Sequence, residues 1–219
     1  IGHAQPEVAI VSWEDGICLS EVTRRPAFGG CYMEEGELSS RRAAARHLAR
    51  TFWLLLFEHH IALGGLCAGN VLLRTAMDEE QLEVVLLRCG LCHQVDAETL
   101  QDLKHLTQLL RRGADSEEVG HLILTRGQAE EVHDLDGFFS SINSLLGKSA
   151  GCGVMPPLRG AVLLHRFLEI LHRHRLKASE VHLQVATSAA ATHAVCSRLD
   201  PFSYGGLFEA LLEVAPDKG

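Results

Sequence analysis

The sequence predicts a mainly α-helical fold with one small β-hairpin. Leucines recur at helical spacing over residues 96–112, and further helical segments follow Gly113. Two short apolar runs, 71–73 and 82–87, flank the polar stretch 75–81, which is the pattern of a hairpin. The chain has 219 residues, of which 47% are hydrophobic and 22% are charged, so it is long and apolar enough to bury a core.

The N-terminal half is expected to hold short strands, one long helix and the hairpin. A helix is predicted because Ser39 or Ser40 can cap a run of strong helix formers that ends near Glu58. In that helix Leu48 and Phe52 fall on one face with Leu55 and Leu56. The other expected elements of this half are a strand at 7–12, a turn at 13–16, a strand at 17–22, and loops at 24–36, 60–70 and 89–95.

The C-terminal half is expected to be helical. Gly113 ends the leucine-striped helix, because glycine readily adopts the left-handed conformation that closes helices. The other expected helices are 117–124, 128–133, 136–146, 159–174, 178–192 and 204–214. The stretch 147–158 is rich in glycine and proline, so we expect a core unit over 1–146, a linker over 147–158 and a helical extension over 159–219.

Charge and cysteine usage exclude several classes of protein. The formal net charge is −8, from 20 basic and 28 acidic residues, which is unlike a nucleic-acid binder. The arginines at helical spacing over 41–50 are interpreted as a solvated helix face. No apolar run reaches the roughly 18 residues of a membrane span. Seven cysteines, an odd number, follow no secretory signal, so we expect reduced thiols and a cytoplasmic protein.

The segment after the long helix resembles the catalytic loop of protein kinases. In kinases such a helix precedes the pattern H-R-D-L-x-x-x-N. Here the chain reads Leu63-Gly64-Gly65-Leu66-Cys67-Ala68-Gly69-Asn70, which aligns with that pattern without a gap. Leu66 and Asn70 match it, and Gly65 stands at the position of the catalytic aspartate. The Leu-Cys-Ala-x-Asn wording is similar to the pseudokinase domains of Janus kinases.

Two later segments continue the resemblance. The second hairpin strand runs into Arg88-Cys89-Gly90-Leu91, which stands at the D-F-G-L position and keeps its glycine and leucine. Asp102 then opens a segment similar to the buried C-lobe helix whose aspartate bonds to the catalytic-loop backbone. Residues 7–20 correspond to the last N-lobe strand and the hinge. The resemblance covers about residues 7–146 and implies a protein-kinase-like C-lobe with the N-lobe absent or truncated.

The aligned positions lack the groups that phosphoryl transfer needs. Gly65 supplies no base, and Arg88 places a cation where a carboxylate would hold Mg²⁺. Asn70 remains, but the first 103 residues contain no lysine for the nucleotide phosphates. We therefore expect degenerate catalytic positions at Gly65, Asn70, Arg88 and Gly90, no enzyme activity, no cofactor and no ATP binding. Asp102 is expected to be structural.

The resemblance then implies a pseudokinase that acts as a protein-interaction scaffold or allosteric regulator. Its working surface is predicted on the helix 159–174, where leucines line one face and basic groups the other. The residues predicted there are Arg159, Leu163, Arg166, Phe167 and Arg173. The expected partner is a protein with an acidic rim, or a second copy of the chain, and neither nucleic acid nor a membrane.

Two other interpretations stay open at this point. One is a non-catalytic binding module derived from the C-lobe alone. The other is a metal or haem protein, because Cys89-Gly-Leu-Cys92-His93 matches the C-x-x-C-H pattern of c-type haem attachment. The same pair could be a thioredoxin-like dithiol, a zinc site completed by His105, or small core residues under a loop. Our preferred interpretation includes no metal.

Overall fold

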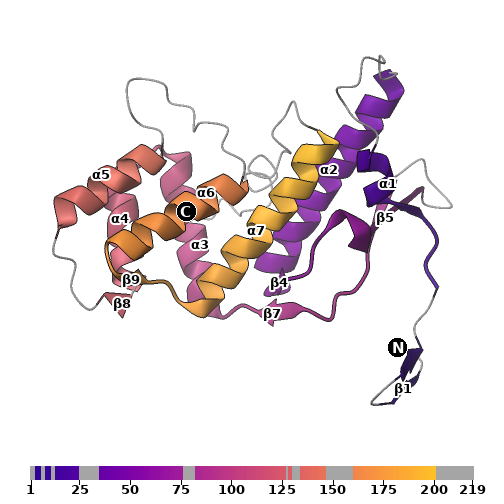
Figure 1. Cartoon of the computed structure of the whole chain (residues 1–219), viewed down its shortest axis with the longest axis horizontal. Helices are drawn as coiled ribbons and strands as arrows, with labels where there is room; N and C mark the ends of the chain where they lie inside the picture. Colours follow the sequence, from indigo (N-terminus) through magenta and orange to yellow (C-terminus); the bar gives the residue numbers. More distant parts are fainter. Residues whose placement is uncertain are drawn as a thin grey trace.

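The computed structural model describes residues 3–5, 8–10, 13–24, 35–75, 82–126, 128–129, 134–146 and 160–200. Within these ranges the chain is mainly helical, as predicted (Figure 1). The α-helices are α1 (Leu19–Arg24), α2 (Glu35–Phe57), α3 (Ala97–Arg111), α4 (Ser116–Arg126), α5 (Leu135–Leu145), α6 (Gly160–Arg173) and α7 (Glu180–Leu199). In the described ranges no helix is both long enough and apolar enough to cross a membrane.

The strands are short and pair antiparallel wherever the structure describes them. They are β1 (His3–Gln5), β2 (Val8–Ile10), β3 (Ile17–Cys18), β4 (Ile61–Leu63), β5 (Val71–Thr75), β6 (Leu82–Leu86), β7 (Cys92–Gln94), β8 (Gln128–Ala129) and β9 (Leu176–Lys177). The pairs are β1 with β2, β4 with β7, and β8 with β9, and β5 lies between β3 and β6. The predicted hairpin is confirmed as β5 and β6, with Val71 opposite Leu86.

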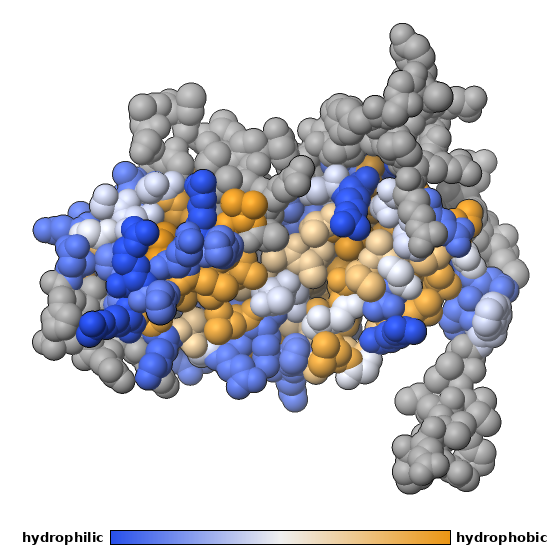
Figure 2. Space-filling model, in the orientation of Figure 1, coloured by the Kyte–Doolittle hydropathy of each residue, from blue (hydrophilic) through white to orange (hydrophobic). Residues whose placement is uncertain are grey.

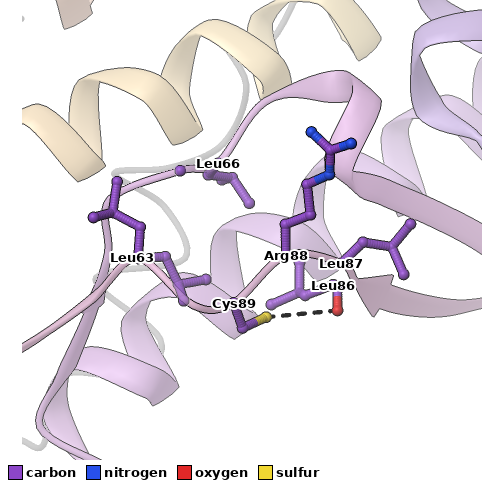
Figure 3. Close-up of a pocket in the computed structure, with 8 residues that line it drawn as sticks. Leu63, Leu66, Leu86, Leu87, Arg88 and Cys89 are labelled. Atoms are coloured by element: carbon purple, nitrogen blue, oxygen red, sulfur yellow. Dashed lines mark hydrogen bonds between the residues drawn. The ribbon is translucent and has the colours of Figure 1, made fainter. Parts of the chain in front are cut away.

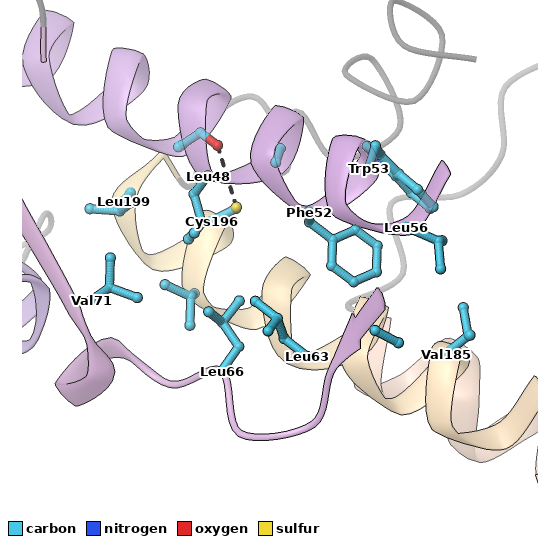
Figure 4. Packing of buried hydrophobic residues seen from close by; sticks show 14 of the residues in the cluster. Leu48, Phe52, Trp53, Leu56, Leu63, Leu66, Val71, Val185, Cys196 and Leu199 are labelled. Carbon is cyan, nitrogen blue, oxygen red and sulfur yellow. Dashed lines mark hydrogen bonds between the residues drawn. The ribbon is translucent and has the colours of Figure 1, made fainter. Parts of the chain in front are cut away.

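A first hydrophobic cluster joins α2, α7 and the segment that follows α2. Leu48, Phe52 and Leu56 recur every fourth residue of α2, so they form one stripe, and all three are buried. Val185 and Cys196 of α7 lie against this stripe (Figure 4). The Cys196 thiol donates a hydrogen bond to the carbonyl of Ala45, 3.5 Å away. This cluster holds β4 and the following loop in place.

A second cluster is built by α4, α5 and α6 together with the end of α3. Phe138 and Ile142 of α5 are fully buried against Ile170 and Leu171 of α6. The leucine stripe of α3 spans both clusters, with Leu100 and Leu103 in the first and Leu106 and Leu109 in the second. Gly113, at φ +67°, ends α3 as the sequence predicts. Thus α3 connects the two halves seen in Figure 1.

Several element boundaries differ from the sequence-based expectation. The strand expected at 17–22 covers only 17–18, and α1 begins at Leu19. The long helix begins at Glu35, so Ser39 and Ser40 lie inside it and do not cap it. Residues 128–129 form a strand that pairs with β9, whereas a helix was expected. The helix expected at 178–192 extends to Leu199, with Ser179 as its cap.

Other expectations fall on segments with no description. The linker 147–158 and the helix 204–214 lie outside the described residues, and so does most of the loop 24–36. The helices α6 and α7, which belong to the expected extension 159–219, pack into the same two clusters as the earlier helices.

Candidate functional site

The end of α2 and the strand pair β4–β7 position the loop that resembles a catalytic loop. After the last turn of α2, His60 adopts a left-handed conformation with φ +58°, which turns the chain into β4. The carbonyl of His60 accepts a hydrogen bond of 2.8 Å from the Val95 amide. Ile61 then pairs with Gln94 and Leu63 with Cys92. These pairs fix both strands. The loop that follows β4 therefore faces the loop that precedes β7.

Gly64 is where these two loops approach most closely. Its amide donates a 2.8 Å hydrogen bond to the carbonyl of Leu91. A Cβ atom at Gly64 would lie 2.9 Å from His93 Nε2 and 2.9 Å from Leu91 Cγ. Any larger residue would therefore displace the side chains of His93 and Leu91, which gives Gly64 a packing role that sequence reasoning missed. The only sequence signal was the Gly64-Gly65 pair itself.

Asn70 ties the loop to itself and to the hairpin. Its side-chain Nδ2 donates a hydrogen bond of 2.9 Å to the carbonyl of Gly65. Its backbone amide donates to Cys67, and its carbonyl accepts a 2.7 Å bond from the Leu87 amide. The Asn70 amide group is thus engaged in holding the loop 65–70 in shape, and Asn70 also connects that loop to the end of β6.

A shallow recess lies between this loop and the segment that leaves β6 (Figure 3). Its empty space, counted together with the open solvent at its mouth, amounts to about 210 Å³. Among the described residues that line it, leucines dominate, Arg88 is the one charged residue, and no carboxylate contributes. The lining residues are Leu63, Gly65, Leu66, Leu86, Leu87, Arg88, Cys89 and Leu91.

The structure brings together three of the four predicted degenerate positions. Gly65 and Arg88 both line the recess although 23 positions separate them in the sequence, and Asn70 bonds to Gly65. Arg88 is exposed and has φ +55°, a conformation that costs a non-glycine residue about 1 kcal/mol. Gly90 lies in the next turn, and a Cβ atom there would meet no other atom within 4 Å. Crowding therefore does not require glycine at position 90.

Asp102, predicted to be structural, is a buried residue of α3. Its Oδ2 atom lies 3.6 Å from Nε2 of His182, on α7. The other ring nitrogen of His182 lies 2.5 Å from Oγ of Ser179, the residue that caps α7. Sequence reasoning missed His182, because no sequence pattern indicates that it contacts Asp102, which lies 80 positions earlier in the chain.

The residues Cys89, Cys92 and His93 do not converge on one point. Successive side chains of a strand point to opposite faces. Accordingly Cys92, the first residue of β7, is exposed, whereas His93 is half-buried and directs Nε2 at Gly64. Among the described residues no group of three or more potential ligands is placed to hold a metal ion. These positions argue against a zinc site built from all three residues.

The two thiols are not core residues either. Cys89 and Cys92 are both exposed, in contrast to the expectation of small buried side chains under a loop. The Cys89 thiol donates to the carbonyl of Leu86 at 3.5 Å, and the Cys92 thiol donates to the carbonyl of Cys89 at 2.5 Å. Partial burial, together with the charge of the Cys92 thiolate, raises the pKa of Cys89 above its ordinary value.

The predicted interaction surface is described only in part. Arg159 and the side chain of Leu163 lie outside the described residues. Arg166 and Arg173 are exposed on the outer face of α6. Phe167, in contrast, is half-buried and packs against the second cluster, so it belongs largely to the inner face.

No model of a known protein family matches this chain, and no curated protein is similar to it in sequence. The resemblance to kinases therefore depends on the residues and geometry of this chain alone.

Proposed function

We propose that this protein is a catalytically inactive, kinase-C-lobe-like module that acts as a protein-interaction scaffold or allosteric regulator. The observation that carries the proposal is the recess in which Gly65 and Arg88 meet. In the kinase resemblance these two positions belong to the catalytic base and to the metal-binding aspartate. Here one has no side chain and the other carries a positive charge.

The composition of the recess supports the absence of phosphoryl transfer. Mg²⁺ sites rely on carboxylates together with substrate phosphates, and the recess lining includes neither aspartate nor glutamate. A guanidinium at the metal position of the resemblance repels a divalent cation. The Asn70 amide, the one retained metal ligand of the resemblance, is engaged with the carbonyl of Gly65. The Asn70 side chain therefore serves the shape of the loop.

The order of elements supports the C-lobe part of the proposal. A long helix, a loop, a hairpin and a further helix with a buried aspartate follow one another as α2, the loop 64–70, β5–β6 and α3. This order follows the series of the sequence resemblance, except that the aspartate was expected to open the last helix, whereas Asp102 lies inside α3, which begins at Ala97. The additional pair β4–β7 holds the two aligned loops against each other.

The outer face of α6 is the proposed interaction surface. Arg166 and Arg173 are exposed there, and so are the apolar residues Val162 and Leu168, at 39% and 38%. Hydrophilic and apolar residues interleave over this part of the molecule in Figure 2. The chain as a whole is acidic, so a locally basic face favours a partner with an acidic rim around an apolar centre.

Charge reversal on α6 tests the interaction half of the proposal. We expect Arg166→Glu and Arg173→Glu to fold like the parent but to weaken self-association or partner capture, measured by light scattering and by pull-down. Arg46→Glu is the matched control, because Arg46 is an exposed arginine on α2. If both α6 variants fold and associate as the parent and the control do, the interaction surface does not lie on α6.

A further inference from the structure

The turn that follows β6 presents two thiols to solvent within four residues. Cys89 and Gly90 form the turn, Leu91 bends the chain, and Cys92 begins β7. Both cysteines are exposed. The pairing of Cys92 with Leu63 of β4 fixes its backbone, whereas Cys89 lies on the loop side of the turn. One thiol is therefore anchored to a strand, and the other lies on a connecting loop.

The contacts of the two sulfur atoms place them near each other. The Sγ atom of Cys92 lies 2.5 Å from the carbonyl oxygen of Cys89. The Cys92 sulfur is therefore close to the backbone of Cys89. The Cys89 thiol interacts electrostatically with Cys92, which contributes to its raised pKa. A disulfide needs Cα atoms about 4.4–6.8 Å apart, and the chain bends at Leu91, between the two cysteines. Closing the bond requires the Cys89 side chain to leave the Leu86 carbonyl and turn toward Cys92.

We propose that Cys89 and Cys92 form a reversible intramolecular disulfide on reaction with a low-molecular-weight disulfide such as oxidised glutathione. The proposal does not depend on the proposed function. Within the described part of the chain the other cysteines are poorer candidates. Cys196 is buried, and Cys18 is half-buried with its sulfur 3.0 Å from the Ser20 hydroxyl. Cys67 is exposed and serves below as the control.

The reaction consists of two thiol–disulfide exchanges. In the first exchange the Cys92 thiol, on the anchored strand, loses its proton to water, attacks a sulfur of oxidised glutathione and displaces one glutathione thiolate. Cys89 then loses its proton to water, attacks the Cys92 sulfur of the mixed disulfide and displaces the second glutathione. Two protein thiols are oxidised, and one glutathione disulfide is reduced to two glutathione thiols.

Closing this bond changes the wall of the recess. Cys89 lines the recess next to Arg88 and contacts Leu86, which also lines it. In the disulfide form the Cys89 sulfur no longer contacts the Leu86 carbonyl. Leu91, which is 56% exposed and lies between the two cysteines, moves with the turn. The surface around Arg88 therefore differs between the dithiol and disulfide forms.

The sequence makes this disulfide easy to detect. Trypsin cleaves after Arg88 and after Lys104, and the peptide 89–104 contains Cys89 and Cys92 and no other cysteine. The full chain is equilibrated with mixtures of oxidised and reduced glutathione, quenched with acid, alkylated and digested. We expect the peptide to lose both alkyl labels as oxidised glutathione increases and to appear two hydrogens lighter than the dithiol. Dithiothreitol should restore both labels.

Single-cysteine variants test the pairing. Cys89→Ser and Cys92→Ser should each retain one thiol, which forms only a mixed disulfide with glutathione. Cys67→Ser should close the 89–92 disulfide as the parent does. Retention of both labels across the whole series would overturn the proposal. So would peptides that carry glutathione without closure, or a disulfide linking 89–104 to the Cys67 peptide 51–74.

Discussion

Nε2 of His182 lies 3.6 Å from Oδ2 of Asp102, and this contact joins α7 to α3. The side chain of Asp102 is 9% exposed and that of His182 is 29% exposed, so the contact is largely shielded from water. Both helices also contribute to the first hydrophobic cluster. The buried carboxylate of Asp102 therefore lies where α3 meets α7, the helix that packs against α2.

We expect Asp102→Ala to lower the free energy of unfolding by about 1.5–3 kcal/mol, because it removes a buried charged group together with its polar contacts. Urea or thermal melting measures the loss. Asp136→Ala is the control, because Asp136 is an exposed aspartate in the first turn of α5, and it should change stability by about 0.5 kcal/mol or less. In a double-mutant cycle with His182→Ala we expect a coupling of at least about 0.5 kcal/mol. An unchanged melt of Asp102→Ala would contradict its structural role.

Two glycines offer a test of close packing with opposite expected results. A Cβ atom at Gly120 of α4 would lie 2.6 Å from the Phe139 ring of α5, so Gly120→Ala should destabilise by about 1–3 kcal/mol. Gly90, at the retained glycine of the kinase resemblance, has open space around it, so Gly90→Ala should change stability by less than about 0.5 kcal/mol. Denaturant unfolding of the two variants decides. If Gly120→Ala loses as little stability as is expected of Gly90→Ala, the contact between α4 and α5 is looser than described.

Cys196 provides a pH-dependent prediction. Its burial raises the pKa of the thiol from 9.0 to about 12. Between these values the unfolded chain releases a proton that the folded chain retains, so stability falls as the pH rises. Between pH 8 and pH 10 the loss attributable to this thiol is about 1.4 kcal/mol. Chemical unfolding should show this loss in the parent and not in Cys196→Ala. Equal pH slopes for the two proteins would contradict the assignment.

Periodic elements with a local signal were predictable from sequence. The leucine stripe of α3 and the glycine after it depend on residues a few positions apart, and the hairpin β5–β6 shows in its alternation and polar connection. The pairs β4–β7 and β8–β9 were missed because strands of two or three residues have no periodicity of their own. They form because distant segments, such as 128–129 and 176–177, meet in the folded chain.

Only the part of the candidate site that forms a local sequence motif was predictable. The alignment placed Gly65, Asn70 and Arg88 in the same functional group; in the structure Gly65 and Arg88 line one recess, and Asn70 bonds to Gly65. The roles of Gly64 and His182 depend on long-range contacts and left no pattern in the sequence. Phe167 was predicted to be part of the interaction surface, but it packs against the second cluster, because a leucine-rich stripe does not reveal which neighbours cover it.

The most direct test of the proposed inactivity is a phosphoryl-transfer assay on the full chain with radiolabelled ATP and either Mg²⁺ or Mn²⁺. We expect neither autophosphorylation nor ATP hydrolysis above the protein-free background, because in the kinase resemblance Gly65 stands at the position of the catalytic base and Arg88 at that of the metal-binding aspartate. The Asn70→Ala variant is the matched control. It loses the hydrogen bond to Gly65 and should be less stable by about 0.5–1.5 kcal/mol, but should show the same background. Turnover by the parent that Asn70→Ala abolishes would contradict the account.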